Sequence, residues 1–282
     1  MITTKQKWIT IISLLFLILI LAGFRCFKKD EGIVSPNIES LGELEGSNLG
    51  GIIGKIPDHS AKIFFESLLG EKLGSYRSYS NVDETLSALR TNEIQAAWFA
   101  DVTADYLVEA NDGLRLLKTK DSSEPRLDFA MAVRNEDQKL CDELNTALTT
   151  LRENGSLETL VSDYIKNASS ATFYYEFTSS YSKGKPLYVG VTGAVPPIDM
   201  VDSCFRPYGF SVALMDQIQQ LLNRKIILVV IQNDTAFSNL MAGNIDVLFA
   251  YGSSKDTVGT TKNYKMTDGY YTMDKYSYVV LE

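Results

Sequence analysis

The chain has 282 residues, 45% of them hydrophobic and 22% charged, which is ordinary for a globular protein with room for two small domains. Its formal net charge of −8 argues against a nucleic-acid partner, because nucleic acids are bound through a basic face. The only histidine is His59, and Cys26, Cys141 and Cys204 are widely spaced. This composition predicts neither a metal site nor a cofactor.

The N-terminal region contains an apolar segment. Residues 8–24 (WITIISLLFLILILAGF) carry no charge, and basic residues flank them on both sides. Residues 1–7 are predicted to form a short N-terminal tail. Residues 8–24 are therefore predicted to form a single transmembrane anchor. Two alternatives stay open: a cleaved signal peptide, and a lipid anchor on Cys26, although Arg25 stands where such a signal needs a small residue.

The first half of the chain alternates between two kinds of apolar pattern. Segments with helical spacing of apolar side chains alternate with short apolar runs typical of buried strands. Helices are expected at residues 60–73, 83–90, 137–152 and 156–165, and strands at 49–55, 94–100 and 127–134.

The second half repeats this rhythm after a segment rich in Ser, Thr and Tyr, residues 167–185, which is predicted to be a linker. Strands are expected at residues 187–192, 225–231, 245–251 and 276–281, and helices at 209–223 and 235–242. Two sets of alternating strands and helices separated by a linker predict two α/β lobes.

Several short motifs in the second half resemble a known family. They include the strand YVGVT at residues 188–192, the loop Pro196-Pro197-Ile198, the helix start at 209–212 and the helix-to-strand turn at 240–246. Together they are similar to the first lobe of family 3 extracellular solute-binding proteins, the polar amino-acid receptors of ABC importers. The resemblance implies a two-lobed, periplasmic-binding-protein-like (type 2) fold.

The first half resembles the second lobe of the same family, so the lobes stand in reversed order. Residues 32–166 correspond to the second lobe with its closing helices, and residues 186–282 to the first lobe. This order predicts a circular permutation; the junction of two truncated tandem modules is the alternative. Permutation predicts that residues 276–281 and 130–134 are adjacent hinge strands, and that the chain end lies near residues 32–40.

Solutes bind such folds where strands end and helices begin, because exposed backbone N–H groups lie there. The candidates in the second lobe follow two of its strands: Asp58, His59 and Ser60 at a helix start, and Asp101. The candidates in the first lobe are Ile198, Asp199, Tyr251, Gly252, Ser253 and Ser254. Plainer roles stay open, such as helix capping for Asp58 or Ser60 and packing for Tyr251.

The resemblance implies that Asp101 lies one residue from the aspartate that receives a ligand ammonium group. Two features depart from the family. Its carboxylate-binding arginine is missing after Ser254, where Lys255 is the nearest cation. Its Pro-Pro-aromatic loop has Ile198 instead of an aromatic residue. An amino-acid ligand is thus implied by the family resemblance alone.

The sequence predicts a cell-membrane, single-pass protein whose bulk is extracytoplasmic and which captures a small polar solute for import through an ABC permease. The alternatives are a ligand-sensing ectodomain acting on a sensor partner, or a fragment of a tandem-module sensor. None of the motifs Gly-x-Ser-x-Gly, His-Glu-x-x-His or the P-loop occurs, so an enzyme is not expected.

Overall fold

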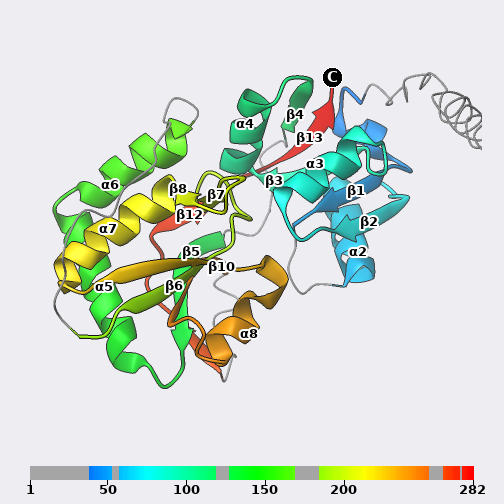
Figure 1. Ribbon diagram of the computed structural model, residues 1–282. Helices are drawn as coiled ribbons and strands as arrows, with labels where there is room; N and C mark the ends of the chain where they lie inside the picture. Colours follow the sequence, from blue (N-terminus) through cyan, green and yellow to red (C-terminus); the bar gives the residue numbers. More distant parts are fainter. Residues whose placement is uncertain (1–37, 53–56, 119–126, 169–183, 254–262, 274) are drawn as a thin grey trace, which may run out of the picture. The chain divides into compact units, whose positions relative to one another are not determined.

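The computed structural model describes residues 38–52, 57–118, 127–168, 184–253, 263–273 and 275–282. These residues form two separate α/β lobes, each built on its own main sheet (Figure 1). We call residues 38–118 with 275–282 lobe A and residues 127–273 lobe B. The predicted α/β fold with two lobes is confirmed, and lobe B contains most of the segment that resembles the family's first lobe.

Lobe A has a five-stranded sheet in the order β2-β1-β3-β13-β4. Strand β1 is parallel to β2 and β3, and β13 is antiparallel to β3 and β4. The strands are β1 (Asn48–Gly51), β2 (Ser75–Ser78), β3 (Ala96–Ala100), β4 (Leu114–Lys118) and β13 (Tyr276–Leu281).

Helices cover both faces of the lobe A sheet. The helix α2 (Asp58–Leu69) packs on one face through Ala61 and Phe65, next to the 3-10 turn η1 (Leu41–Leu44). The helices α3 (Val82–Arg90) and α4 (Asp101–Ala110) pack on the other face. The apolar residues at helical spacing form these contacts, and they remove apolar surface from water at about 25 cal/mol per Å².

Lobe B has a six-stranded sheet in which β11-β5-β10-β6-β9 form the main path and β12 also pairs with β5. The strands are β5 (Leu127–Arg134), β6 (Leu187–Val191), β9 (Ile226–Val230), β10 (Val247–Ser253), β11 (Tyr264–Met266) and β12 (Tyr271–Met273). A small hairpin of β7 (Met200–Val201) and β8 (Pro207–Tyr208) stands apart from it. The helices are α5 (Gln138–Glu153), α6 (Ser156–Val161) with the π turn η2 (Ser162–Lys166), α7 (Phe210–Leu222), and α8 (Ala236–Met241) after the 3-10 turn η4 (Asn233–Thr235).

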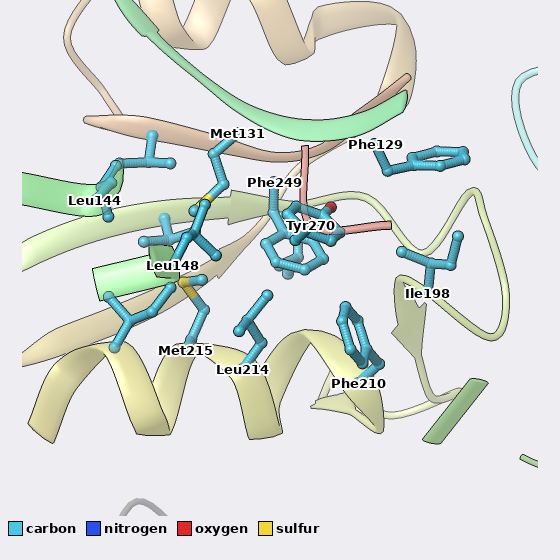
Figure 2. Packing of buried hydrophobic residues seen from close by; sticks show 14 of the residues in the cluster. Phe129, Met131, Leu144, Leu148, Ile198, Phe210, Leu214, Met215, Phe249 and Tyr270 are labelled. Atoms are coloured by element: carbon cyan, nitrogen blue, oxygen red, sulfur yellow. The ribbon is translucent and has the colours of Figure 1, made fainter. Parts of the chain in front are cut away.

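The core of lobe B lies between its sheet and the helices α5 and α7. Leu148 of α5 and Leu214 of α7 are fully buried against Met131 and Phe249 of the sheet (Figure 2). The opposite face is covered by α8, whose Leu240 packs with Ala132 and Leu248. Helices cover both faces of the lobe B sheet, which explains why the sequences of β6 and β9 are continuous apolar runs and do not alternate between apolar and polar residues.

The position of β13 corrects one prediction. Residues 276–281 do not lie beside residues 130–134: β13 is inserted between β3 and β4 of lobe A, whereas β5 pairs with β10, β11 and β12 of lobe B. Because β13 is buried along Tyr276–Val280, it needs a partner strand on each side, and only β3 and β4 supply both. The end of β13 does lie near Ile38, since Val280 and Ile38 share one buried cluster.

Within the described ranges, no helix is long and apolar enough to cross a membrane. The predicted anchor at residues 8–24 and most of the predicted linker lie outside those ranges.

Candidate functional site

The parallel strands of lobe A bring several helix starts to one edge of the sheet. Strands β2, β1 and β3 end at Ser78, Gly51 and Ala100, and α3, α2 and α4 begin after these strands. The first backbone N–H groups of a helix have no partner within the helix. This edge therefore presents backbone donors to a polar or anionic group.

The predicted residues Asp58, His59 and Ser60 all lie at this edge, in the exposed first turn of α2. Asp58 accepts a hydrogen bond from the backbone N–H of Ser78 at 3.0 Å, which ties the start of α2 to the end of β2. The alternative that Asp58 or Ser60 caps the helix is wrong, because Pro57 is the N-cap and no side chain caps it.

Asp101 is the first residue of α4 and lies at the same edge. Its backbone N–H donates to the carbonyl of Lys275 at 3.0 Å, and its carboxylate accepts a hydrogen bond from the Ser277 hydroxyl at 2.6 Å. Because Ser277 is buried in β13, it holds the Asp101 side chain in one orientation. Sequence reasoning missed Ser277; the signal was a serine within the otherwise apolar and aromatic run YSYVVL.

In lobe B the parallel strands β9, β6 and β10 also end at one edge, and the loop after β6 carries the predicted Ile198 and Asp199. One carboxylate oxygen of Asp199 accepts hydrogen bonds from the Thr192 N–H at 2.8 Å, the Thr192 hydroxyl at 3.0 Å and the Gly193 N–H at 3.1 Å. These bonds close the loop on itself. Asp199 therefore positions the loop that follows β6.

The structure corrects the roles expected of Ile198 and Asp199, because both side chains are completely buried. Ile198 belongs to the lobe B core, on the side of Phe210 (Figure 2). Asp199 turns inward to the start of its own loop. Neither side chain is accessible to a solute as it stands, and sequence spacing alone did not show which way the loop faces.

Burial raises the pKa of Asp199 to about 6, although the hydrogen bonds from Thr192 and Gly193 favour the charged form. Its other carboxylate oxygen, Oδ1, is buried and has no hydrogen-bond partner among the described residues. A buried carboxylate oxygen without a donor disfavours ionisation, which agrees with the direction of the shift.

This pKa predicts how stability responds to pH. The folded state holds the Asp199 proton more tightly than an unfolded chain does, so this group stabilises the fold below its folded pKa and the contribution is lost as pH rises from about 4 through 6. As pH falls from 8 to 5, the free energy of unfolding is expected to rise by about 1.4 kcal/mol. Urea unfolding gives the free energy of unfolding of the wild type and of Asp199→Asn at each pH in this range. The contribution of Asp199 is the difference between these two profiles of free energy against pH. Parallel profiles would contradict the prediction.

The strand β10 continues through Ser253, beyond its predicted end. Its register against β5 shifts between Leu248 and Tyr251, and Ala250 has a φ of 52°, a left-handed conformation that is uncommon for residues other than glycine. After this bulge Tyr251 pairs with Ala130 and Gly252 with Phe129. Ser254 lies outside the described ranges.

Residues 187–281 match the model of the bacterial extracellular solute-binding proteins, family 3. The predicted resemblance to family 3 is confirmed. The match begins with β6 and ends with the last residue of β13. Solute-binding proteins are not enzymes, in line with the prediction.

The arginine-binding extracellular protein ArtP of Bacillus subtilis (strain 168) is 28% identical to the chain over 133 residues. The alignment covers 47% of this chain and 48% of ArtP, so the chain spans about half the length of this relative.

Two solved structures are also similar. The ligand-binding component of an ABC-type import system from Staphylococcus aureus, with zinc bound, has 10% identity and a TM-score of 0.43, and the alignment covers 84% of this chain and 66% of that one. The probable amino-acid ABC transporter extracellular-binding protein ytmK of Bacillus subtilis has 10% identity and a TM-score of 0.40, with 85% of each chain covered.

Proposed function

We propose that this chain is the extracytoplasmic solute-binding component of an ABC-type importer and captures a small polar solute with an ammonium group. The observation that carries the proposal is the family match over residues 187–281, which spans the parallel strands of lobe B and the strand β13 that enters lobe A. The name of ArtP, an arginine-binding protein, supports an amino acid as the solute class.

Asp101 is the proposed partner of the ammonium group. It lies at the edge where the lobe A strands end, and Ser277 fixes its carboxylate. The starts of α2 and α4 supply backbone N–H groups at the same edge, which suit a carboxylate in place of the missing arginine.

A thermal-shift panel tests this function on the full chain purified in detergent. The 20 amino acids and a set of non-zwitterionic polar solutes are added singly to the protein. A true ligand present at 100 times its Kd is expected to add about 2.7 kcal/mol of apparent stability. Failure of every amino acid to raise the melting temperature of a well-folded sample would contradict the amino-acid proposal.

We also propose that the chain is a circular permutation of the family's module. The position of β13 supports this: the family match ends at its last residue, and the described N-terminal part of the chain supplies β3 and β4 on either side of it. A rearranged gene that places residues 187–281 before residues 38–166 should yield a protein with the same ligand affinity. A rearranged protein that does not fold would favour the tandem-fragment alternative.

Residues 8–24 are proposed to anchor the protein in the cell membrane with its bulk outside, on the basis of their uncharged apolar sequence. Cell fractionation is expected to place the protein in the membrane fraction, with both lobes open to protease added from outside. Recovery of the intact protein in the soluble fraction would contradict an anchor.

A further inference from the structure

The strand β9 forms an outer edge of the lobe B sheet. It pairs with β6 on one side, and no other strand that the structure describes pairs with its other side. Its sequence, IILVV, is entirely apolar, and the four residues after Ile226 are partly exposed. The free backbone groups of such an edge are a template for pairing with another chain, and most proteins protect their edge strands with charges, proline or short length.

The other edge strands of the two main sheets have this protection. The strand β2 contains Arg77, β4 contains Arg115 and Lys118, and β11 contains Lys265. The strand β12, which pairs only with β5, has just 3 residues. Within the described ranges, β9 is therefore the one edge strand of these sheets that is longer than β12 and has no charged side chain.

The pairing with β6 leaves a regular set of backbone groups on the outer side of β9. The carbonyl of Lys225 and the N–H of Ile231 both form hydrogen bonds with β6. Backbone groups alternate in direction along a strand, so the residues of β9 with odd numbers face β6. Leu228 and Val230 consequently direct both their N–H and their C=O groups away from the sheet.

The side chains of β9 are apolar on both faces of the sheet. Leu228 and Val230 pack partly against the core on the α7 side, and Val229 and Ile231 pack partly against the cluster on the α8 side. Another strand placed alongside β9 would cover these side chains on both faces, and the burial of apolar surface would stabilise that pairing.

The two ends of β9 carry opposite charges. Arg224 and Lys225 precede the strand, and Asp234 follows it as an exposed residue of η4. The Nε of Arg224 donates to the carbonyl of Lys185 at 2.7 Å, which holds this side chain at the end of the strand. If two copies of β9 pair antiparallel about an axis through Val229, Arg224 of one copy lies opposite Asp234 of the other.

We propose that β9 pairs antiparallel with β9 of a second copy of this chain, so that one sheet runs through both lobes B. A second copy fits because the edge is complementary to itself: a two-fold axis at Val229 matches the opposite charges and also places Leu228 opposite Val230, which can exchange N–H and C=O bonds. The pairing uses the side of the sheet and leaves the strand ends open. The dimer is thus independent of the proposed function, and each copy binds solute separately.

Sedimentation equilibrium of the full chain in detergent tests the dimer. At micromolar concentrations the wild type is expected to have twice the protein mass of 31.4 kDa. Val230→Pro removes one outward N–H and leaves the bonds to β6 in place, so this variant should dimerise at least about tenfold more weakly. A monomeric wild type, or a folded Val230→Pro that dimerises like the wild type, would overturn the inference. Circular dichroism establishes that the variant is folded.

Charge variants give a second test that does not depend on proline. Asp234→Arg places like charges opposite each other twice in the dimer and should weaken it about tenfold. The double variant Arg224→Glu/Asp234→Arg exchanges the two charges and should restore the dimer. Asp112→Arg, which makes the same change in net charge at an exposed residue of lobe A, is the matched control and should leave the dimer unchanged. Wild-type dimerisation of Asp234→Arg, or no recovery in the double variant, would overturn the antiparallel pairing.

Discussion

Leu214→Ala is expected to lower the free energy of unfolding by about 2–5 kcal/mol. Leu214 lies in the middle of α7 and is completely buried against the lobe B sheet (Figure 2). Removing its side chain loses transfer free energy and leaves a cavity, because the helix and the sheet around it relax only in part. Small domains are stable by only about 5–15 kcal/mol, so this single change would remove a large fraction.

The matched control is Leu221→Ala, the same substitution on the same helix at a side chain that is 44% exposed. It should change the unfolding free energy by no more than about 0.5 kcal/mol, as is usual for surface positions. Urea unfolding followed by circular dichroism measures both variants. Equal losses at the two positions would show that α7 does not pack on the sheet through Leu214.

Asp101→Asn is expected to weaken binding of an ammonium-bearing solute by about 30-fold or more. The substitution removes the charge but keeps an oxygen that can accept the Ser277 hydroxyl, so the local structure should persist. Truncating one partner of a desolvated charge pair costs about 2–5 kcal/mol, much of it from the ammonium group left without a counter-charge.

Asp105→Asn serves as the control, because Asp105 is an exposed carboxylate on the same helix. It should bind the solute like the wild type. Calorimetry with the ligand found in the thermal-shift panel measures both variants. An unchanged affinity in Asp101→Asn, with the melting temperature of the free protein also unchanged, would rule out Asp101 as the ammonium partner.

Long segments with a strong apolar pattern were predictable from the sequence. The strands at residues 127–134 and 276–281 have the predicted bounds, and α5 and α7 differ from prediction by one residue at each end. Shorter or more polar elements were missed. The strand β2 has the sequence SYRS, and α4 follows β3 without a turn, so neither gives a clear period or boundary.

The candidate site was predictable only in part. The positions of Asp58 and Asp101 at strand ends follow from the alternation of strands and helices, because parallel strands bring their carboxyl ends to one edge. The burial of Ile198 and Asp199 does not follow from it. Those two residues belong to a loop whose direction is set by hydrogen bonds to Thr192 and by packing against α7, which local sequence does not encode.

The sequence by itself determined the α/β class, the two lobes and the family resemblance, since these depend on local apolar periodicity and short motifs. Only the tertiary structure decided which sheet contains β13, because strand pairing depends on contacts between residues far apart in sequence. The strand β13 lies between β3 and β4 of lobe A. Its Ser277 hydroxyl donates a hydrogen bond to Asp101, which is 176 positions away in the sequence.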